Sequence, residues 1–184
     1  MAINFSSAKY YPDVAAGGVF IGSTAAAGTA LPAAGGTAMT FGLWNNTSNK
    51  NAVLIGFAAS YVSGTITVAG FGLTIIPNAG VSIASGGPIS AFTAGTPTNA
   101  LVNAGSASSM LFTPSAATIV AGTRYQFTGI GHEIATAGPG MNTGFQDFNG
   151  IPILSPGSAA FVTGSIAQTG LFAMTLIWSE IASS

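Results

Sequence analysis

The chain contains no cysteine, so neither a disulfide bond nor a thiolate metal ligand can stabilise it. It has three Lys or Arg residues and four Asp or Glu residues among 184, or 4% charged residues. An ordinary soluble domain carries about 25%. A monomer of this size exposes roughly 8,000 Å², an area that so few charges cannot solvate in the usual way. We therefore expect other subunits to cover much of the surface.

Long apolar runs are also missing, and no segment approaches the roughly 18 unbroken apolar residues of a membrane-spanning helix. The basic residues Lys9, Lys50 and Arg124 are spread along the chain, whereas nucleic-acid binding requires a basic patch. Residues 1–9 lack the basic and long apolar regions of a secretion signal. These absences predict a protein that is made in the cytoplasm and binds neither membrane nor nucleic acid.

Apolar residues and turn formers are abundant, with 48% hydrophobic residues, 26 glycines and 9 prolines. Short apolar runs separated by Gly, Pro, Ser, Thr and Asn are typical of strands joined by turns. No segment keeps the apolar spacing of three and four residues, so we expect little or no helix. The sequence predicts an all-β, jelly-roll-like antiparallel sandwich as a single domain over residues 19–184. An extended N-terminal arm, residues 1–18, precedes it, and we expect this arm to dock on another subunit.

The strand candidates follow the apolar runs. They are residues 19–23, 37–44, 52–62, 65–68, 72–76, 81–84, 88–92, 108–112, 118–120, 124–128, 151–154, 159–164 and 171–180. The polar segment 45–51 is expected to be a loop that joins two neighbouring strands. Ser155-Pro156-Gly157-Ser158 has the residues of a type II turn, which links the strand candidates on its two sides.

Several short motifs resemble small β-rich virion proteins of tailed bacteriophages. They are Phe41-Gly42-Leu43-Trp44-Asn45-Asn46, Asn49-Lys50-Asn51-Ala52-Val53-Leu54-Ile55, Tyr61-Val62-Ser63-Gly64-Thr65, Ile151-Pro152-Ile153-Leu154-Ser155-Pro156-Gly157-Ser158-Ala159 and Leu176-Ile177-Trp178-Ser179-Glu180-Ile181. The similarity covers about half of the chain, and its motifs are turns and strand ends, without a catalytic signature. It implies a jelly-roll-like subunit on a capsid or tail, commonly trimeric, beside other virion proteins such as a major capsid protein.

Residues with catalytic chemistry are scarce. His132 is the only histidine. A hydrolase triad would need it beside Asp13 or Asp147, yet no G-x-S-x-G elbow is present. His132-Glu133 lacks the second histidine of a zinc helix motif, and the four carboxylates are scattered. We therefore expect no catalytic, cofactor-binding or metal-binding residues, although a calcium site that uses Asp147 and backbone carbonyls stays open.

Trp44 and Trp178 could stack on sugars, but each stands among apolar residues at a strand end, so we expect core or interface packing. The sequence therefore predicts a non-enzymatic structural subunit of a phage virion, a capsid decoration or minor capsid protein that forms a homotrimer. A self-assembling extracellular fibre subunit that uses β-strand exchange, a sugar-binding receptor module and a small hydrolase are the alternatives.

Overall fold

Strands dominate the computed structural model, which describes residues 9–83, 87–103, 105–120, 124–134 and 145–183, without the side chains of residues 128–134. The elements in chain order are α1 Tyr11–Ala15, β1 Val19–Ser23, β2 Thr29–Ala30, β3 Ala38–Met39, β4 Gly42–Asn45, β5 Lys50–Ser63, β6 Ala69–Ile76, β7 Ile89–Phe92, β8 Thr98–Asn99, β9 Leu111–Thr113, β10 Ala117–Ile119, β11 Tyr125–Ile134, β12 Phe145–Asp147, β13 Ile153–Leu154, β14 Ser158–Gly164 and β15 Leu171–Ala182. All pairs of named strands are antiparallel. The predicted all-β antiparallel sandwich is confirmed.

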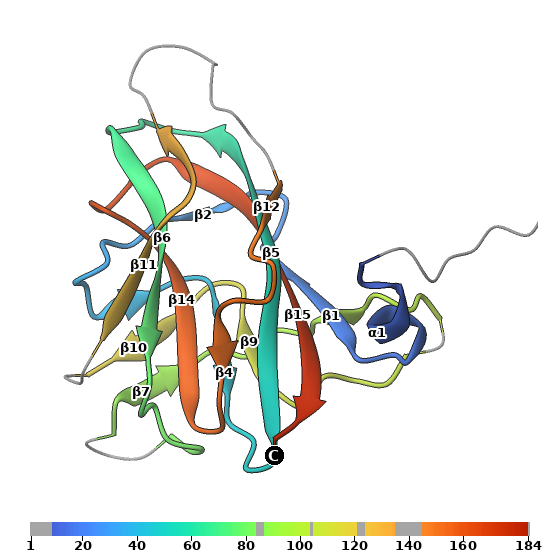
Figure 1. Cartoon of the computed structure of the whole chain (residues 1–184). Coiled ribbons are helices and arrows are strands. Elements are labelled where there is room, and N and C mark those ends of the chain that lie inside the picture. Colours follow the sequence, from blue (N-terminus) through green and yellow to red (C-terminus); the bar gives the residue numbers. More distant parts are fainter. Residues whose placement is uncertain (1–8, 84–86, 104, 121–123, 135–144, 184) are drawn as a thin grey trace, which may run out of the picture.

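The strands form three sheets (Figure 1). The large sheet has the order β12-β5-β15-β1-β8, with β13 also paired to β5 and β2 to β15. The middle sheet has the order β11-β6-β14-β4-β9, and the small sheet has the order β3-β10-β7. The most extensive pairing joins β5 to β15, with two register shifts along it.

The main core lies between the large and middle sheets. Its side chains come mostly from alternate positions of the facing strands, as the two-residue period of a strand requires; in β5 a register shift separates Leu54 from Phe57 by three positions. The large sheet contributes Phe20, Leu54, Phe57, Phe172, Met174, Leu176 and Trp178, and the middle sheet contributes Leu43, Phe71, Leu73, Phe112, Ala160 and Val162. Stacked rings of Phe112 and Trp178, with centroids 6.0 Å apart, join the two layers.

A second core lies on the other face of the middle sheet, which the small sheet covers. Met39, Ile89, Ala117 and Ile119 of the small sheet pack against Trp44, Ile76, Ala159 and Phe161 of the middle sheet. Strand β14 therefore contacts apolar layers on both faces, and every one of its residues is buried. This three-layer arrangement makes β14 the innermost strand of the molecule.

The extended conformation expected for residues 1–18 is wrong for Tyr11–Ala15, which form α1. Pro12, at the start of this helix, loses no hydrogen bond there because the first helical amides have no intrahelical acceptor. Residues 9–18, which we call the strap, contact the large sheet of their own chain at both ends. Residues 1–8 lie outside the described residues.

The two predicted connections are present, but each joins strands of different sheets. The loop after Asn45 leads from β4 in the middle sheet to β5 in the large sheet, and the turn at Gly157 leads from β13 back to β14. The turn itself is confirmed, because Gly157 has a φ of +75° and the Ser158 amide donates to the Ser155 carbonyl at 3.1 Å. At both connections the chain therefore crosses from one layer to another.

Residues 65–68, expected as a strand, connect β5 to β6 without strand pairing. The Thr67 amide donates to Gln168 Oε1 at 2.8 Å, and Thr169 Oγ1 donates to the Thr65 carbonyl at 3.1 Å. Side chains thus take the place of a partner strand. Residues 81–83, also expected as a strand, form none, and Ala84 lies outside the described residues. No helix within the described ranges has the length and hydropathy to cross a membrane.

Candidate functional site

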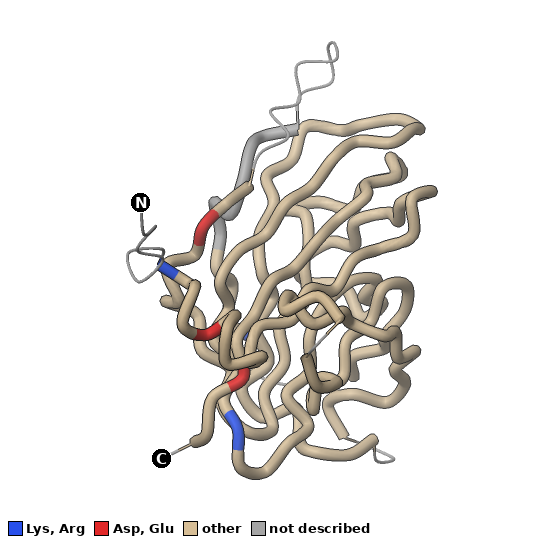
Figure 2. The backbone as a smooth tube through the Cα atoms, turned by 90° about the vertical axis from the view of Figure 1, so that its right-hand side faces the viewer, with Lys and Arg blue, Asp and Glu red and all other residues tan. Residues whose placement is uncertain are grey.

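The described charged residues lie mainly on one side of the molecule, as Figure 2 shows. Lys50, Asp147 and Glu180 belong to strands of the large sheet or its edge, and Lys9 and Asp13 belong to the strap. Strands β4, β6, β9 and β14 of the middle sheet and all strands of the small sheet carry no charged residue. The two exposed sides of the molecule therefore differ in chemistry.

Asp147 fastens the strap to β12, the outermost strand of the large sheet. Tyr10 donates its phenolic hydrogen to Asp147 Oδ1 at 2.7 Å, the Asn149 amide donates to the same oxygen at 2.7 Å, and Lys9 Nζ lies 2.9 Å from Oδ2. Hydrogen bonds from Tyr10, Asn149 and Lys9 lower the pKa of Asp147 to about 2. A carboxylate this acidic is a poor general base.

Glu180 forms a second, buried cluster at the end of β15. Its side chain is 2% exposed. Its carboxylate accepts hydrogen bonds from Ser108 Oγ at 2.5 Å, from the Ser109 amide at 3.1 Å and from Lys50 Nζ at 3.2 Å. Burial raises the pKa of Glu180, but these hydrogen bonds outweigh burial, so its pKa lies below the ordinary value. The cluster fixes the segment before β9 to the large sheet.

Of the candidate catalytic residues, the structure describes the side chains of Asp13 and Asp147, which lie in different elements. Asp13 lies in α1, and Asp147 lies in β12, where it accepts the hydrogen bond from Tyr10 of the strap. His132 and Glu133 belong to β11 by their backbone, and their side chains lie outside the description. Within the described ranges, no group of three His, Cys, Asp or Glu residues is placed to hold a metal ion.

Both tryptophans are core residues, with exposures of 1% for Trp44 and 0% for Trp178. Trp44 Nε1 donates to the Gly80 carbonyl at 2.7 Å, which satisfies its polar atom inside the second core. The predicted packing role is confirmed for both residues. Neither ring is available for stacking on a sugar.

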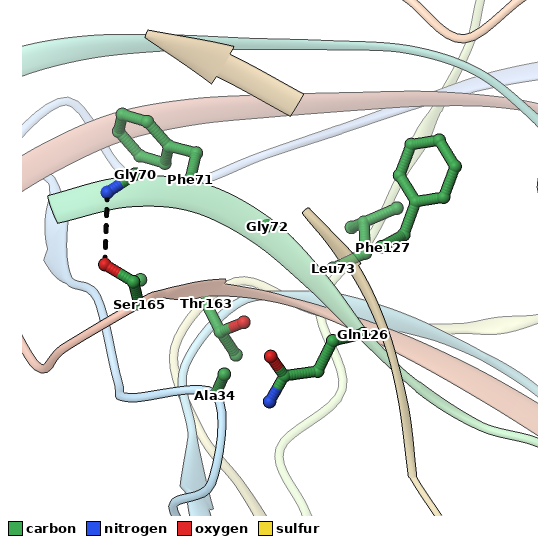
Figure 3. A pocket seen from close by; sticks show the side chains of 10 residues that line it. Ala34, Gly70, Phe71, Gly72, Leu73, Gln126, Phe127, Thr163 and Ser165 are labelled. Carbon is green, nitrogen blue, oxygen red and sulfur yellow. Dashed lines mark hydrogen bonds between the residues drawn. The ribbon is translucent and has the colours of Figure 1, made fainter. Parts of the chain in front are cut away.

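A small hollow lies over β6, where Gly70 and Gly72 provide no side chain (Figure 3). Its volume is about 90 Å³. Thr163, Ser165, Ala34 and Gln126 surround it on one side of the β6 ribbon in Figure 3, and Phe71, Leu73 and Phe127 lie on the other side. The alternation of β6 explains this division, because glycines face one side of the sheet and Phe71 and Leu73 face the core.

The hollow offers only neutral chemistry. Its polar side chains are a glutamine amide and two hydroxyls, and no lining residue is ionisable. The Ser165 hydroxyl accepts from the Gly70 amide at 3.2 Å, and the Thr163 hydroxyl lies 3.1 Å from that of Thr74. Ligand pockets usually enclose about 300–1,000 Å³. A hollow of this size suits a single apolar side chain better than a substrate.

Sequence reasoning missed both polar clusters, because their partners lie far apart along the chain. Lys9 precedes Asp147 by 138 positions, and Lys50 precedes Glu180 by 130 positions. No short motif connects such residues. Comparison of the chain with protein-family models, curated proteins and solved structures finds no match.

Proposed function

We propose that the chain is a non-enzymatic structural subunit that assembles with copies of itself on the virion of a tailed bacteriophage. One observation supports the assembly role: large apolar side chains are exposed to solvent on a molecule with few charged residues. Fifteen described residues of this kind are exposed, namely Tyr11, Tyr61, Val62, Val68, Val81, Ile83, Val102, Val120, Tyr125, Phe127, Phe145, Ile151, Ile153, Ile166 and Ile181. Single exposed apolar residues are ordinary, but contiguous ones indicate an interaction surface.

The placement of the charges adds to this argument. Both ion pairs of the described residues join parts of one subunit, the strap to β12 and β5 to β15. Few charged groups are therefore left to keep separate copies in solution. Association between copies covers such a surface without the need for further charges.

The virion as the site of assembly rests on the resemblance of the turn and strand-end motifs to small virion proteins. A capsid decoration or minor capsid protein, present as a homotrimer beside a major capsid protein, is the form that we propose. The jelly-roll order of strands is part of the same proposal.

The chemistry of the ionisable groups supports a non-enzymatic role without nucleic-acid contact. Asp147 and Glu180 accept several hydrogen bonds each, so neither is poised to take a proton near neutral pH. Lys9 and Lys50 are paired with these carboxylates, and Arg124 donates to the Gly36 carbonyl at 2.5 Å. Tracking a phosphate backbone would require basic groups gathered on one surface.

A fibre subunit is the second candidate, because β11 is an edge strand of the middle sheet. Its partner within the described residues is β6, so its outer edge is open to a strand from another molecule. The two candidates differ in the shape of their assemblies, because the virion subunit should form closed oligomers and the fibre subunit should form filaments.

Light scattering over a dilution series and electron microscopy of the purified chain test the proposal. We expect a closed oligomer of three copies that persists at micromolar concentration, and we expect labelled antibodies to decorate intact phage particles. A stable monomer contradicts the assembly role. Filaments favour the fibre subunit, and hydrolysis of an ester, peptide or glycan by the purified chain contradicts the non-enzymatic role.

A further inference from the structure

Three isoleucines form an exposed patch at the edge of the large sheet. Ile151 is 72% exposed, Ile153 is 55% exposed and Ile181 is 42% exposed. Ile153 pairs with Val53 of β5, and Ser179, two residues before Ile181, pairs with Val53 from the other side. We call Ile151, Ile153, Ile181 and the half-buried Val53 the isoleucine patch.

Strand geometry places these side chains on one face. Residues 151–154 alternate between exposed isoleucines and the buried Pro152 and Leu154. The Leu54 amide donates to the Pro152 carbonyl at 3.0 Å, which extends the ladder of β13 toward Ile151. Residues two apart in a strand share a face, so Ile151 and Ile153 project outward together, next to Val53.

The chain segment that precedes the strap starts beside this patch. Lys9 Nζ donates to Asn149 Oδ1 and lies 2.9 Å from Asp147 Oδ2. Asn149 is only two residues from Ile151. Eight residues precede Lys9 in the sequence, and we call residues 1–8 the leading segment. Fully extended, they reach roughly 26 Å from Lys9.

The leading segment has the chemistry that the patch requires. Met1, Ile3 and Phe5 are apolar and alternate with Ala2, Asn4 and Ser6, and no side chain of residues 1–8 is charged. Alternating apolar residues suit an extended peptide that lies against a sheet, with every second side chain on the apolar surface. A peptide without charged side chains also leaves no unpaired side-chain charge on the isoleucines.

The direction of the strap favours a second copy as the source of this peptide. The strap starts from Gly18, next to β1, and reaches Asp147 on β12, so it crosses the large sheet and arrives at its outermost strand. A chain that continues in this direction leaves its own domain. A domain of this length has a radius of gyration of about 16 Å, so a reach of roughly 26 Å extends well onto a neighbour.

We propose that the isoleucine patch of one copy binds the leading segment of a second copy. The inference rests on the proposed self-assembly and adds the surface and the peptide that join two copies. Phe5 and Ile3 supply the apolar side chains, and the isoleucine patch provides the surface that they cover.

Substitution of Ile153 by Asn tests the surface. The Ile153 side chain is exposed within one copy, so its replacement should have little effect on folding. The substitution removes the apolar side chain that the interface between copies would bury. We expect the dissociation constant between copies to rise about 10-fold or more. Ile166→Asn is the matched control, because Ile166 is 44% exposed and lies outside the patch. Equal weakening by both substitutions, or no weakening by Ile153→Asn, overturns the proposal.

Cross-linking tests the peptide and its origin, since the chain has no cysteine of its own. Phe5→Cys and Ile153→Cys chains are mixed and treated with a short bismaleimide, and mass spectrometry identifies the product. We expect a cross-link between the two variants, and none between Phe5→Cys and Val102→Cys chains, because Val102 lies near β8 at the other edge of the large sheet. A link that forms only within a chain carrying both Phe5→Cys and Ile153→Cys overturns the proposal.

The proposed function and this inference fail in different ways. A chain that stays monomeric in light scattering contradicts both. A chain that forms oligomers, but gives no cross-link from Phe5→Cys to Ile153→Cys, contradicts only the inference and leaves self-assembly in place.

Discussion

Replacing Glu180 by Gln removes one negative charge from the buried cluster at the end of β15 and keeps the shape of the side chain. The carboxylate accepts from Ser108 Oγ, the Ser109 amide and Lys50 Nζ. A hydrogen bond to a charged group contributes about 1.5–3 kcal/mol, and an amide can replace only part of this. Because the Lys50 side chain is 39% exposed, water screens its part of the interaction. We expect Glu180→Gln to lower the free energy of unfolding by about 1–3 kcal/mol at pH 7.

The same substitution also changes how the stability of the fold depends on pH. The folded-state pKa of Glu180 is below its ordinary value of 4.5, and that of Asp147 is about 2. Groups with depressed folded-state pKa values stabilise the fold above their unfolded pKa values, and this stabilisation is lost as the pH falls through the folded values. The wild-type chain should therefore lose stability as the pH falls below about 4. Glu180→Gln should have a shallower slope there, because Asp147 alone of the two groups still titrates.

Urea denaturation at fixed protein concentration measures this effect, since association between copies makes stability depend on concentration. A series from pH 7 to pH 2.5 with tryptophan fluorescence as the signal covers the window. Asp13→Asn, which removes the carboxylate of α1, is the control and should change stability by less than about 0.5 kcal/mol. A Glu180→Gln chain within about 0.5 kcal/mol of wild type at pH 7, or with an unchanged slope, refutes the reasoning.

Two further predictions concern the strap and a closely packed glycine of the middle sheet. Asp147→Asn should weaken the contact with Lys9, so trypsin should cleave after Lys9 several-fold faster while the sandwich stays folded. An unchanged cleavage rate contradicts the role of Asp147 in holding the strap to β12. Gly42→Ala should destabilise the fold by about 1–3 kcal/mol, because a Cβ there would overlap the backbone oxygen of Ala160. Gly35→Ala meets nothing within 4 Å and should change the free energy of unfolding by less than about 1 kcal/mol, which equilibrium denaturation measures for both variants.

The sequence allowed the strands to be predicted where apolar residues alternate or run continuously. Strand β1 covers the predicted residues 19–23, and the burial of Trp44 and Trp178 follows from their apolar neighbours. Helix α1 was missed because five residues are too few to establish a helical period. Strands β2 and β8, of two residues each, carry no pattern at all.

The layers were harder to predict than the strands. A turn such as Ser155–Ser158 is visible in the sequence, but nothing in it says whether the chain returns beside the same strand or crosses to the other sheet. One feature of the sequence indicates that the small sheet covers the middle sheet. Ala159, Phe161 and their neighbours in β14 are small or apolar at every position, and a strand with this composition is typical of a layer covered on both faces.

The position of the few charges limits the forces that can hold copies of this chain together. Lys9 and Lys50 are already paired with Asp147 and Glu180 inside the subunit, so using them in another contact would break an existing one. Apart from β11, the strands of the middle and small sheets offer hydroxyls and apolar side chains, and the isoleucine patch offers only apolar surface. Any assembly of this chain therefore depends mainly on apolar burial and neutral hydrogen bonds. Such contacts are little affected by ionic strength but weaken on cooling.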